Sequence, residues 1–470
     1  MPTLVDDLSA ALAPDRVRAG DHDLAVYGRD ASTYVGGAAS AVCFPTSTAE
    51  VQACVLAARR HGVPFVARGS GTGLAGGAVP LDGAVVVVTT RMDRIVSVDV
   101  EGRSAWVEPG VLNLDLSRAV APHGLRFAPD PSSQQACSIG GNVANNSGGP
   151  HCLSEGVTSA HVLAVEVVLP DGSIALFGSD AGGYDLRGAF VGGEGTLGIA
   201  TRIQVRLVPL PPSVATLLLD FTTLGAAAAT VSAVIAGGVV PGAMEMLAGR
   251  MIAAVEAFVG AGFPVDAEAL LLVELEGLPA GVAADVAAVE RIGRAGGARS
   301  IRVAADEAER AAWWKGRKSA FGAVARIAPN YYLHDTVVPR ARLVEVLAEV
   351  DRVAAEHHLI VCNVFHAGDG NLHPLLVFDA REPGVLEHVH AAGEAIVRAS
   401  LDAGGVLSGE HGIGLEKRDF MRLQFDDDDL DAQARVRRAF DPDGVANPRK
   451  VLPRGAGCAD LAGLPEGVWL

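Results

Sequence analysis

Closely spaced cysteines are missing from this sequence. Its six cysteines are spread from Cys43 to Cys458, and no two of them form a C-x-x-C pair. Iron–sulfur clusters are held by several thiolates that commonly come from such short spacings. We therefore expect no iron–sulfur cluster within this chain, and we interpret most of the cysteines as small buried side chains.

Long apolar runs and an excess of basic residues are also missing. Hydrophobic residues make up 49% of the 470 residues, but no stretch reaches the roughly 18 consecutive apolar residues of a transmembrane helix. The net charge of −17 argues against the cationic surface that nucleic-acid binding requires. Asp6 and Asp7 stand where a signal peptide would carry lysine or arginine. We therefore expect a cytoplasmic protein, either free or peripheral at the inner face of the membrane.

Glycine, in contrast, is abundant, with 56 residues gathered in a few compact loops. Strand and helix patterns alternate between these loops and predict an α+β fold. Three prolines within 209–212 mark a boundary between two folded parts. Residues 126–156 show almost no regular pattern, and a loop of this length inside a compact domain is usually functional.

Three glycine-rich loops have the chemistry to hold a phosphate-bearing cofactor. The first, over 68–77, follows an expected strand and lets several backbone N–H groups converge on one anion. It also contains a G-x-G-x-x-G pattern, but no helix opens at its last glycine and no clear βαβ unit follows, which disfavours a dinucleotide-binding fold. The loops over 129–149 and 193–195 repeat the same chemistry. Together the three loops could enclose one long cofactor.

Two histidines and a glutamate form a candidate metal site. His366 and His373 enclose a Gly-Asp-Gly-Asn turn between two expected strands, which would bring both side chains to one rim. With Glu410 they make a three-ligand set for a divalent metal such as zinc, with coordination positions left open. His411 could then act as a base or contact the metal ligands. The alternatives are two ordinary loop histidines or, on these residues alone, a zinc hydrolase.

Seven motifs carry a resemblance to a known family. Between about residues 40 and 453 the chain contains, in order, RGSGTGLAGGA, PDPSS, SIGGNVANNSGGP, GGEGTLGI, FHAGDGNLHP, SGEHGIG and FDPDGVANPRK. Together they resemble the FAD-linked D-2-hydroxyacid dehydrogenases of the vanillyl-alcohol oxidase/p-cresol methylhydroxylase superfamily. That family includes D-lactate dehydrogenase, the flavin subunit of glycolate oxidase and D-2-hydroxyglutarate dehydrogenase.

The resemblance implies an α+β fold with a two-part FAD-binding domain of the p-cresol methylhydroxylase type. That domain would span 41–212 after a helical lead over 1–40. A substrate (cap) domain with the metal site would span 213–415, and a segment over 416–470 would pack back on the FAD domain.

The resemblance assigns FAD contacts to the glycine loops and to the tail. The implied residues are Arg68, Gly69, Ser70, Gly71, Thr72, Gly73, Pro129, Ser133, Gly140, Gly141, Asn142, Asn146, Glu194, Ile199 and Asn447. Of these, Glu194 and Ile199 are expected at the adenine end. Covalent members carry a histidine in the first loop, and none lies between His61 and His123 here. FAD is therefore expected to bind non-covalently.

The implied reaction oxidises D-lactate, glycolate or D-2-hydroxyglutarate to the 2-oxoacid by hydride transfer to flavin N5. A metal on His366, His373 and Glu410 would polarise the substrate hydroxyl, with zinc expected and manganese or iron as alternatives. His411 would accept the hydroxyl proton, because an imidazole can do so at neutral pH.

A cation for the substrate carboxylate is expected in the segment over 313–318, Trp-Trp-Lys-Gly-Arg-Lys. The arginine that contacts the carboxylate in the family carries over to Arg317, whose planar fork suits that group. A solvated basic helix face is the alternative. Asn371 would either touch the substrate or only form the turn. In the tail, Arg449 stands where the family has a glycine.

The electrons need an acceptor outside this chain, which could be a quinone, a cytochrome, an electron-transfer flavoprotein or an iron–sulfur subunit. One alternative is therefore a flavin subunit within a glycolate oxidase-type complex. An alkyl-glycerone-phosphate synthase-like transferase is disfavoured by the Glu410–His411 pair. No nucleic-acid partner is expected, and a homodimer is compatible with the sequence.

Overall fold

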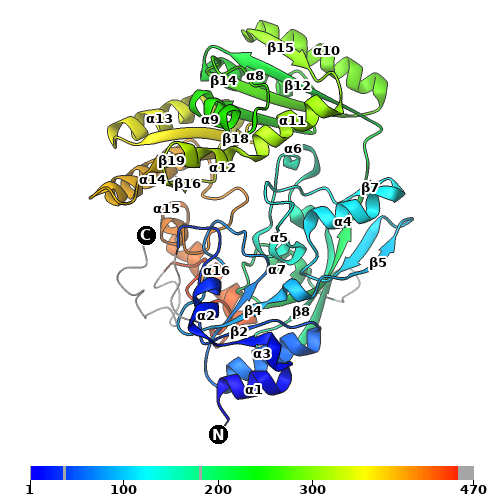
Figure 1. Cartoon of the computed structure of the whole chain (residues 1–470), viewed down its shortest axis with the longest axis vertical. Coiled ribbons are helices and arrows are strands. Elements are labelled where there is room, and N and C mark those ends of the chain that lie inside the picture. The colour runs from blue at the N-terminus through cyan, green and yellow to red at the C-terminus, as the bar shows by residue number, and fades with distance from the viewer. Residues whose placement is uncertain (1, 35–38, 179–182, 454–470) are drawn as a thin grey trace. The chain divides into compact units, whose positions relative to one another are not determined.

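The computed structural model describes residues 2–34, 39–178 and 183–453, so Cys458 and the other residues of the predicted tail beyond 453 lie outside it. The chain forms two compact units, each built of sheet and helices (Figure 1). The first unit contains Met1–Gly148, Val157–Leu210 and Glu410–Leu470. The second contains Gly149–Gly156 and Pro211–Gly409. Among the described residues, no helix is long and apolar enough to cross a membrane.

The first unit opens with a four-stranded sheet in the order β1-β2-β4-β3. Its strands are β1 (Val17–Arg18), β2 (Ala41–Cys43), β3 (Phe65–Arg68) and β4 (Val85–Val88). Both β2 and β3 run parallel to β4, whose four valines are all buried, as expected for a strand covered on both faces. Its helices are α1 (Leu4–Ala11), α2 (Asp21–Tyr27) and α3 (Thr48–Arg60). The first glycine loop leaves the end of β3.

A five-stranded antiparallel sheet follows, in the order β5-β6-β10-β8-β9. Its strands are β5 (Ile95–Asp99), β6 (Ser104–Val107), β8 (Val162–Val168), β9 (Ile174–Gly178) and β10 (Ile199–Arg206). Burial alternates along β10, which is typical of a sheet with one face in the core. The segments around it include β7 (Leu125–Arg126), β11 (Val208–Pro209), α4 (Asn113–Val120), α5 (Ile139–Asn145) and α7 (Leu186–Phe190).

The C-terminal part of the first unit adds α15 (Met421–Gln424) and α16 (Asp427–Phe440) and then reaches the open edge of β3. The Phe65 N–H donates to the Val445 carbonyl at 2.9 Å, and the Asn447 N–H donates to the Phe65 carbonyl at 2.8 Å. The tail thus pairs with the strand from which the first glycine loop emerges.

The second unit is built on one eight-stranded sheet in the order β15-β12-β14-β13-β18-β19-β16, with β17 also paired to β19. The strands are β12 (Ser213–Phe221), β13 (Ala243–Ala248), β14 (Ala269–Gly277), β15 (Ser300–Val303), β16 (Asn330–Leu333), β17 (Thr336–Val337), β18 (Ile360–His366) and β19 (Asn371–Phe378). Neighbouring strands described in this sheet all run antiparallel to each other.

Helices of the second unit pack on this sheet. Apolar side chains of four of them enter one core with the strands: α8 (Leu224–Ala236), α10 (Pro279–Ala295), α13 (Leu343–Glu356) and α14 (Val385–Asp402). The remaining helices are α6 (Cys152–Glu155), α9 (Gly249–Val259), α11 (Glu307–Lys318) and α12 (Ala320–Ala323).

Two features differ from the sequence expectation. Residues 126–156 are not patternless, since α5 and α6 lie within them. The glycines of α5 lower its helix propensity, but Gly140 is required by packing, because a Cβ there would lie 2.6 Å from the Pro109 Cβ. The unit boundaries also differ from the expected domain limits: residues 149–156 belong to the second unit, and Glu410–Leu415 belong to the first.

Candidate active site

The β18–β19 hairpin positions the two histidines of the candidate metal site. His366 is the last residue of β18 and lies opposite Asn371, the first residue of β19. His373 stands two residues further along β19, so its side chain lies on the same face of the sheet. The two imidazole rings are 5.1 Å apart at 86°, and one candidate ligand atom from each lies within 4.8 Å of the other.

Hydrogen bonds at Nδ1 fix the tautomer of both rings. The His366 Nδ1 lies 2.7 Å and 2.9 Å from the two carboxylate oxygens of Glu245. The His373 Nδ1 lies 3.2 Å from the carbonyl oxygen of His334. Because these oxygens accept hydrogen bonds, each neutral ring carries its proton at Nδ1, and Nε2 is the nitrogen that could act as a metal ligand. This donor set fits a divalent metal.

A buried ion pair connects the same carboxylate to the predicted substrate arginine. Arg317, in the last turn of α11, is 1% exposed, and its Nη2 lies 2.6 Å from Glu245 Oε2. This burial is incompatible with a solvated basic helix face at Arg317. Within the described part of the chain, the Arg317 Nε and Nη1 have no hydrogen-bond acceptor. They therefore remain as donors for an anionic ligand.

Asp335 ties the hairpin to the segment that leads to Glu410. It is fully buried, and its Oδ1 accepts from the Asn371 Nδ2 at 2.8 Å. Its Oδ2 accepts from the Ser408 hydroxyl at 2.7 Å and from the Gly409 N–H at 3.0 Å. Gly409 is the last residue of the second unit, and Glu410 and His411 follow it in the first. The Asn371 amide thus anchors the hairpin on Asp335, and its contact with a substrate stays a prediction.

The three predicted FAD loops converge within the first unit. A Cβ on Gly69 would overlap the Ser138 hydroxyl, which caps the start of α5, so the first and second loops approach closely. A Cβ on Gly195 would contact Ala67 and Asn447, which brings the third loop and the tail to the same place. This convergence of bare backbone fits a long phosphate-bearing cofactor such as FAD.

Several of the implied FAD residues are held by contacts inside the protein. Asn142 is buried, and its Oδ1 accepts from the Asn113 Nδ2 at 3.0 Å. The Asn146 Oδ1 accepts from the Ser159 N–H at 2.7 Å. Ile199 lies in an apolar core cluster of the first unit. These contacts give the three residues a structural role, and their contacts with FAD stay predictions.

Asn447 and Lys450 anchor the tail on the loops. The Asn447 Nδ2 donates to the carbonyl oxygens of Gly77 and Glu194 at 2.9 Å and 2.8 Å. The Lys450 Nζ donates to the Val79 carbonyl at 2.6 Å and to the Asn447 Oδ1 at 3.0 Å. Burial lowers the pKa of Lys450 to about 7.

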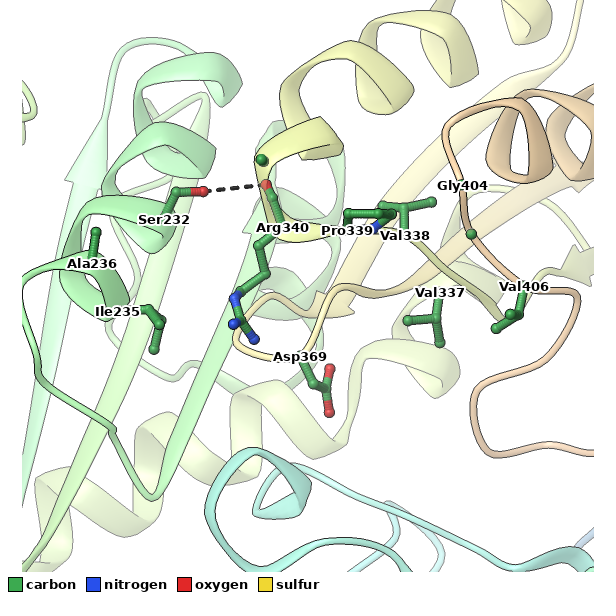
Figure 2. Close-up of a pocket in the computed structure, with 12 residues that line it drawn as sticks. Ser232, Ile235, Ala236, Val337, Val338, Pro339, Arg340, Asp369, Gly404 and Val406 are labelled. Carbon is green, nitrogen blue, oxygen red and sulfur yellow. Dashed lines mark hydrogen bonds between the residues drawn. The ribbon is translucent and has the colours of Figure 1, made fainter.

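A groove of about 680 Å³ lies beside the histidine turn in the second unit (Figure 2). Its lining is mainly apolar, with side chains such as Ile235, Val337 and Val406, and with Arg340 and Asp369 as its charged residues. Its volume is typical of a ligand pocket. It is lined by none of the candidate histidines and not by Arg317, so it lacks the groups that the proposed chemistry needs.

Sequence reasoning missed Glu245, Asp335 and His334. The register explains Glu245, because β13 pairs with β18 so that Glu245 lies directly opposite His366. One signal in the sequence could have indicated Glu245, which is the single acidic residue in the apolar strand segment Ala-Met-Glu-Met-Leu-Ala. Because burying an unpaired carboxylate is costly, a glutamate in such a strand is expected to have a partner. Asp335 gave a weaker signal, at the end of a strand pattern.

Two family models match the chain. Residues 39–178 match the FAD binding domain, and residues 210–451 match the C-terminal domain of FAD linked oxidases. The glycolate oxidase subunit GlcD of Escherichia coli K12 is 47% identical over 90% of this chain and 85% of its own length. The Bacillus subtilis subunit of the same name is 38% identical over 92% and 93%. A D-lactate dehydrogenase of Anaerostipes hadrus is 31% identical over 94% and 95%.

Solved structures share the fold at low sequence identity. A 4-ethylphenol oxidase from Gulosibacter chungangensis aligns with a TM-score of 0.79 at 19% identity, covering 96% of this chain and 97% of its own. A substrate-bound p-cresol methylhydroxylase aligns with a TM-score of 0.78 at 16% identity, covering 96% of each chain. The predicted p-cresol methylhydroxylase-type α+β fold and the predicted family resemblance are confirmed.

Proposed function

We propose that this chain, which belongs to the family of FAD-linked oxidases, oxidises a 2-hydroxyacid, either glycolate or the D-form of lactate or of 2-hydroxyglutarate, to the 2-oxoacid. It is an FAD-linked oxidoreductase of the glycolate oxidase and D-lactate dehydrogenase type. The observation that carries the proposal is the buried Arg317. Its Nε and Nη1 have no acceptor among the described residues, and its Nη2 lies 3.5 Å from the Nδ1 of His366.

Arg317 would hold the substrate carboxylate. Glu245 takes one nitrogen of the guanidinium and so fixes its orientation, while the other nitrogens remain as donors. Charge-assisted hydrogen bonds of this kind contribute about 1.5–3 kcal/mol each. The buried setting strengthens them, because water does not compete for the donors.

His366 and His373 would hold a metal through Nε2, with Glu410 as the third ligand. The Gly409 N–H donates to Asp335, so the backbone immediately before Glu410 is held at the residue that also accepts from Asn371 of the hairpin. When bound, the metal would supply Lewis acidity at the substrate hydroxyl, and FAD would supply the hydride acceptor. Zinc is the metal that the two imidazoles and a carboxylate favour, with manganese and iron as alternatives.

His411 would take the hydroxyl proton on its ring. The Asn145 Nδ2 donates to the His411 carbonyl at 2.8 Å, which fixes the backbone of His411 on the first unit. The imidazole is the side chain that best accepts a proton near pH 7.

A second candidate is the flavin subunit of a larger electron-transfer complex. The two relatives named GlcD are themselves called glycolate oxidase subunits, and this sequence has no closely spaced cysteines that would hold an iron–sulfur relay. Affinity purification of the tagged chain from its own cells would distinguish the two, because a complex brings an iron–sulfur or cytochrome protein with it and a free-standing enzyme does not.

The decisive experiment mixes purified holoenzyme without oxygen with D- and L-forms of lactate and 2-hydroxyglutarate and with glycolate. Reduction is followed as bleaching of the flavin band at about 450 nm. We expect bleaching by glycolate or by a D-isomer and not by the L-isomers. The proposal fails if no D-2-hydroxyacid and no glycolate bleaches the flavin, with zinc or manganese added.

Arg317→Lys tests the carboxylate contact, and Arg310→Lys is its matched control. Arg310 lies on the same helix and forms an ion pair with the buried Glu274 at 2.9 Å. We expect Arg317→Lys to raise the KM about 10- to 100-fold through loss of one or two charged hydrogen bonds. Arg310→Lys should leave the KM within a few-fold. If the two substitutions raise the KM equally, Arg317 acts only on the stability of the protein and not on binding of the substrate carboxylate.

A further inference from the structure

We propose that Glu194 is a positioning residue that holds the Glu410–His411 segment, rather than a contact for the adenine of FAD. The hydrogen bonds of the first unit support the contact itself. The effect of this contact on catalysis rests on the proposed function, which gives Glu410 and His411 their roles. Glu194 lies in the third glycine loop and is 6% exposed. The segment that it would hold runs over 410–416, so it begins with Glu410 and His411 and includes the backbone amides that Glu194 contacts.

The contact is a carboxylate placed on two backbone amides. Glu194 Oε1 accepts from the Ile413 N–H at 2.7 Å, and Oε2 accepts from the Gly414 N–H at 2.7 Å. An ionised carboxylate has only acceptors and so matches two N–H donors. Both carboxylate oxygens therefore accept from Ile413 and Gly414, which lie two and three residues after His411.

Glu194 itself is held in an unusual backbone conformation. Its backbone φ angle of 50° lies in the left-handed region, which residues other than glycine rarely adopt. Its N–H donates to the Ala144 carbonyl at 2.8 Å. Strained backbone of this kind persists where the surrounding contacts require it, and it clusters at functional sites.

Other FAD loops hold the same segment. The Asn145 Nδ2 donates to the His411 carbonyl at 2.8 Å, and the Leu415 N–H donates to the Ala75 carbonyl at 2.8 Å. The Val451 N–H of the tail donates to the Gly414 carbonyl at 3.0 Å. Each glycine loop and the tail therefore contribute one contact or more.

The second and third glycines of the Gly-Glu-His-Gly-Ile-Gly motif, Gly412 and Gly414, are explained by this arrangement. Gly412 has a φ of 89°, and a Cβ on it would lie 2.8 Å from the Glu194 Oε1. Gly414 has a φ of 51°, and a Cβ on it would overlap the Ala75 carbonyl oxygen. The motif thus combines two chemically active residues with the small residues that let the FAD loops reach their backbone.

The test compares Glu194→Gln with the matched control Glu166→Gln. Glutamine keeps the shape but turns one oxygen into an N–H₂ group that faces a backbone N–H. Glu166 lies in the same unit, on β8, where its Oε1 accepts from the hydroxyls of Thr48 and Thr201 at 2.7 Å and 2.8 Å. Holoenzymes of both variants and of the unchanged protein are measured for backbone amide exchange, zinc and FAD content, kcat and KM.

We expect Glu194→Gln to speed amide exchange at Ile413 and Gly414 about 10- to 100-fold, as expected for loss of a hydrogen bond to a charged group. The kcat should fall at least tenfold with the KM within a few-fold, and the FAD content should stay within twofold. Glu166→Gln should change none of these. Loss of FAD with unchanged exchange at Ile413 and Gly414 would overturn the proposal in favour of an adenine contact.

Glu194→Asp provides the second variant if Glu194→Gln does not fold. Aspartate keeps the charge but is one methylene shorter, so it cannot reach both amides, and the same faster exchange and lower kcat are expected. Unchanged exchange and kcat in this variant would also overturn the proposal. The exchange measurement needs no substrate. If the wild-type protein oxidises no hydroxyacid, the proposed function is refuted, but this test of the Glu194 contact is unaffected.

Discussion

Replacing Glu245 with glutamine removes the negative charge that the hairpin and α11 share. Glu245 is fully buried, and its carboxylate lies 2.6 Å from the Arg317 Nη2 and 2.7 Å from the His366 Nδ1. Glutamine has nearly the same shape, so packing is kept. The change leaves a buried guanidinium without its counter-charge and weakens the hydrogen bond that orients His366.

The expected losses follow from these two contacts. Breaking a buried ion pair by removing one partner costs about 3–5 kcal/mol. For a unit of about 200 residues, each kcal/mol corresponds to about 2–4 °C, so the Tm should fall by roughly 6–20 °C. Loss of the carboxylate behind a metal-binding histidine typically weakens metal binding about 10- to 100-fold.

The assay measures thermal unfolding of the metal-free protein and zinc affinity by competition with a chelator. Glu290→Gln is the control, because Glu290 forms a surface pair with Arg294 at 3.1 Å on α10, and such pairs contribute only about 0–1 kcal/mol. A Glu245→Gln protein with the Tm and zinc affinity of the control would refute both the buried pair and the role of His366 as a ligand.

Two further changes test the first unit. Because burial lowers the pKa of Lys450 to about 7, the folded state binds fewer protons than the unfolded state between pH 7 and about 10.5, where an exposed lysine titrates. Between pH 7 and 9 the free energy of unfolding should therefore rise by about 2 kcal/mol more in the wild-type protein than in Lys450→Met. Urea unfolding at each pH measures this difference. Parallel pH profiles of the two proteins would show that Lys450 stays charged when folded. His411→Ala should keep its FAD and zinc but reduce the flavin about 10²- to 10⁴-fold more slowly in stopped-flow mixing, and an unchanged rate would exclude His411 as the base.

The parts of the site that were predictable from sequence are those made by local residues. The Gly-Asp-Gly-Asn turn predicts that His366 and His373 come together, because it joins two strands directly. Glycine-rich loops likewise indicate places where two backbone segments come close, because glycine has no Cβ. The three glycine loops of the first unit converge as expected.

The parts that were not predictable depend on contacts between distant segments. Glu245 meets His366 only because of the pairing of β13 with β18, and nothing near either residue encodes that register. In the same way, the contact of Glu194 with Ile413 and Gly414 joins residues more than 200 positions apart. Arg317 was assigned from a motif, but its burial beside Glu245 depends on how α11 packs on the sheet.

The pairing of Phe65 with residues 445–447 has a consequence for synthesis of the chain. β3 is the edge strand of its sheet, and its backbone pairs with the tail on the side away from β4. A ribosome adds about 5–20 residues per second, so this edge emerges long before its partner and stays open while the whole second unit is made. Unpaired strand edges are sites of aggregation. A nascent or truncated chain that stops before Val445 therefore leaves this edge exposed until residues 445–447 are made and pair with Phe65.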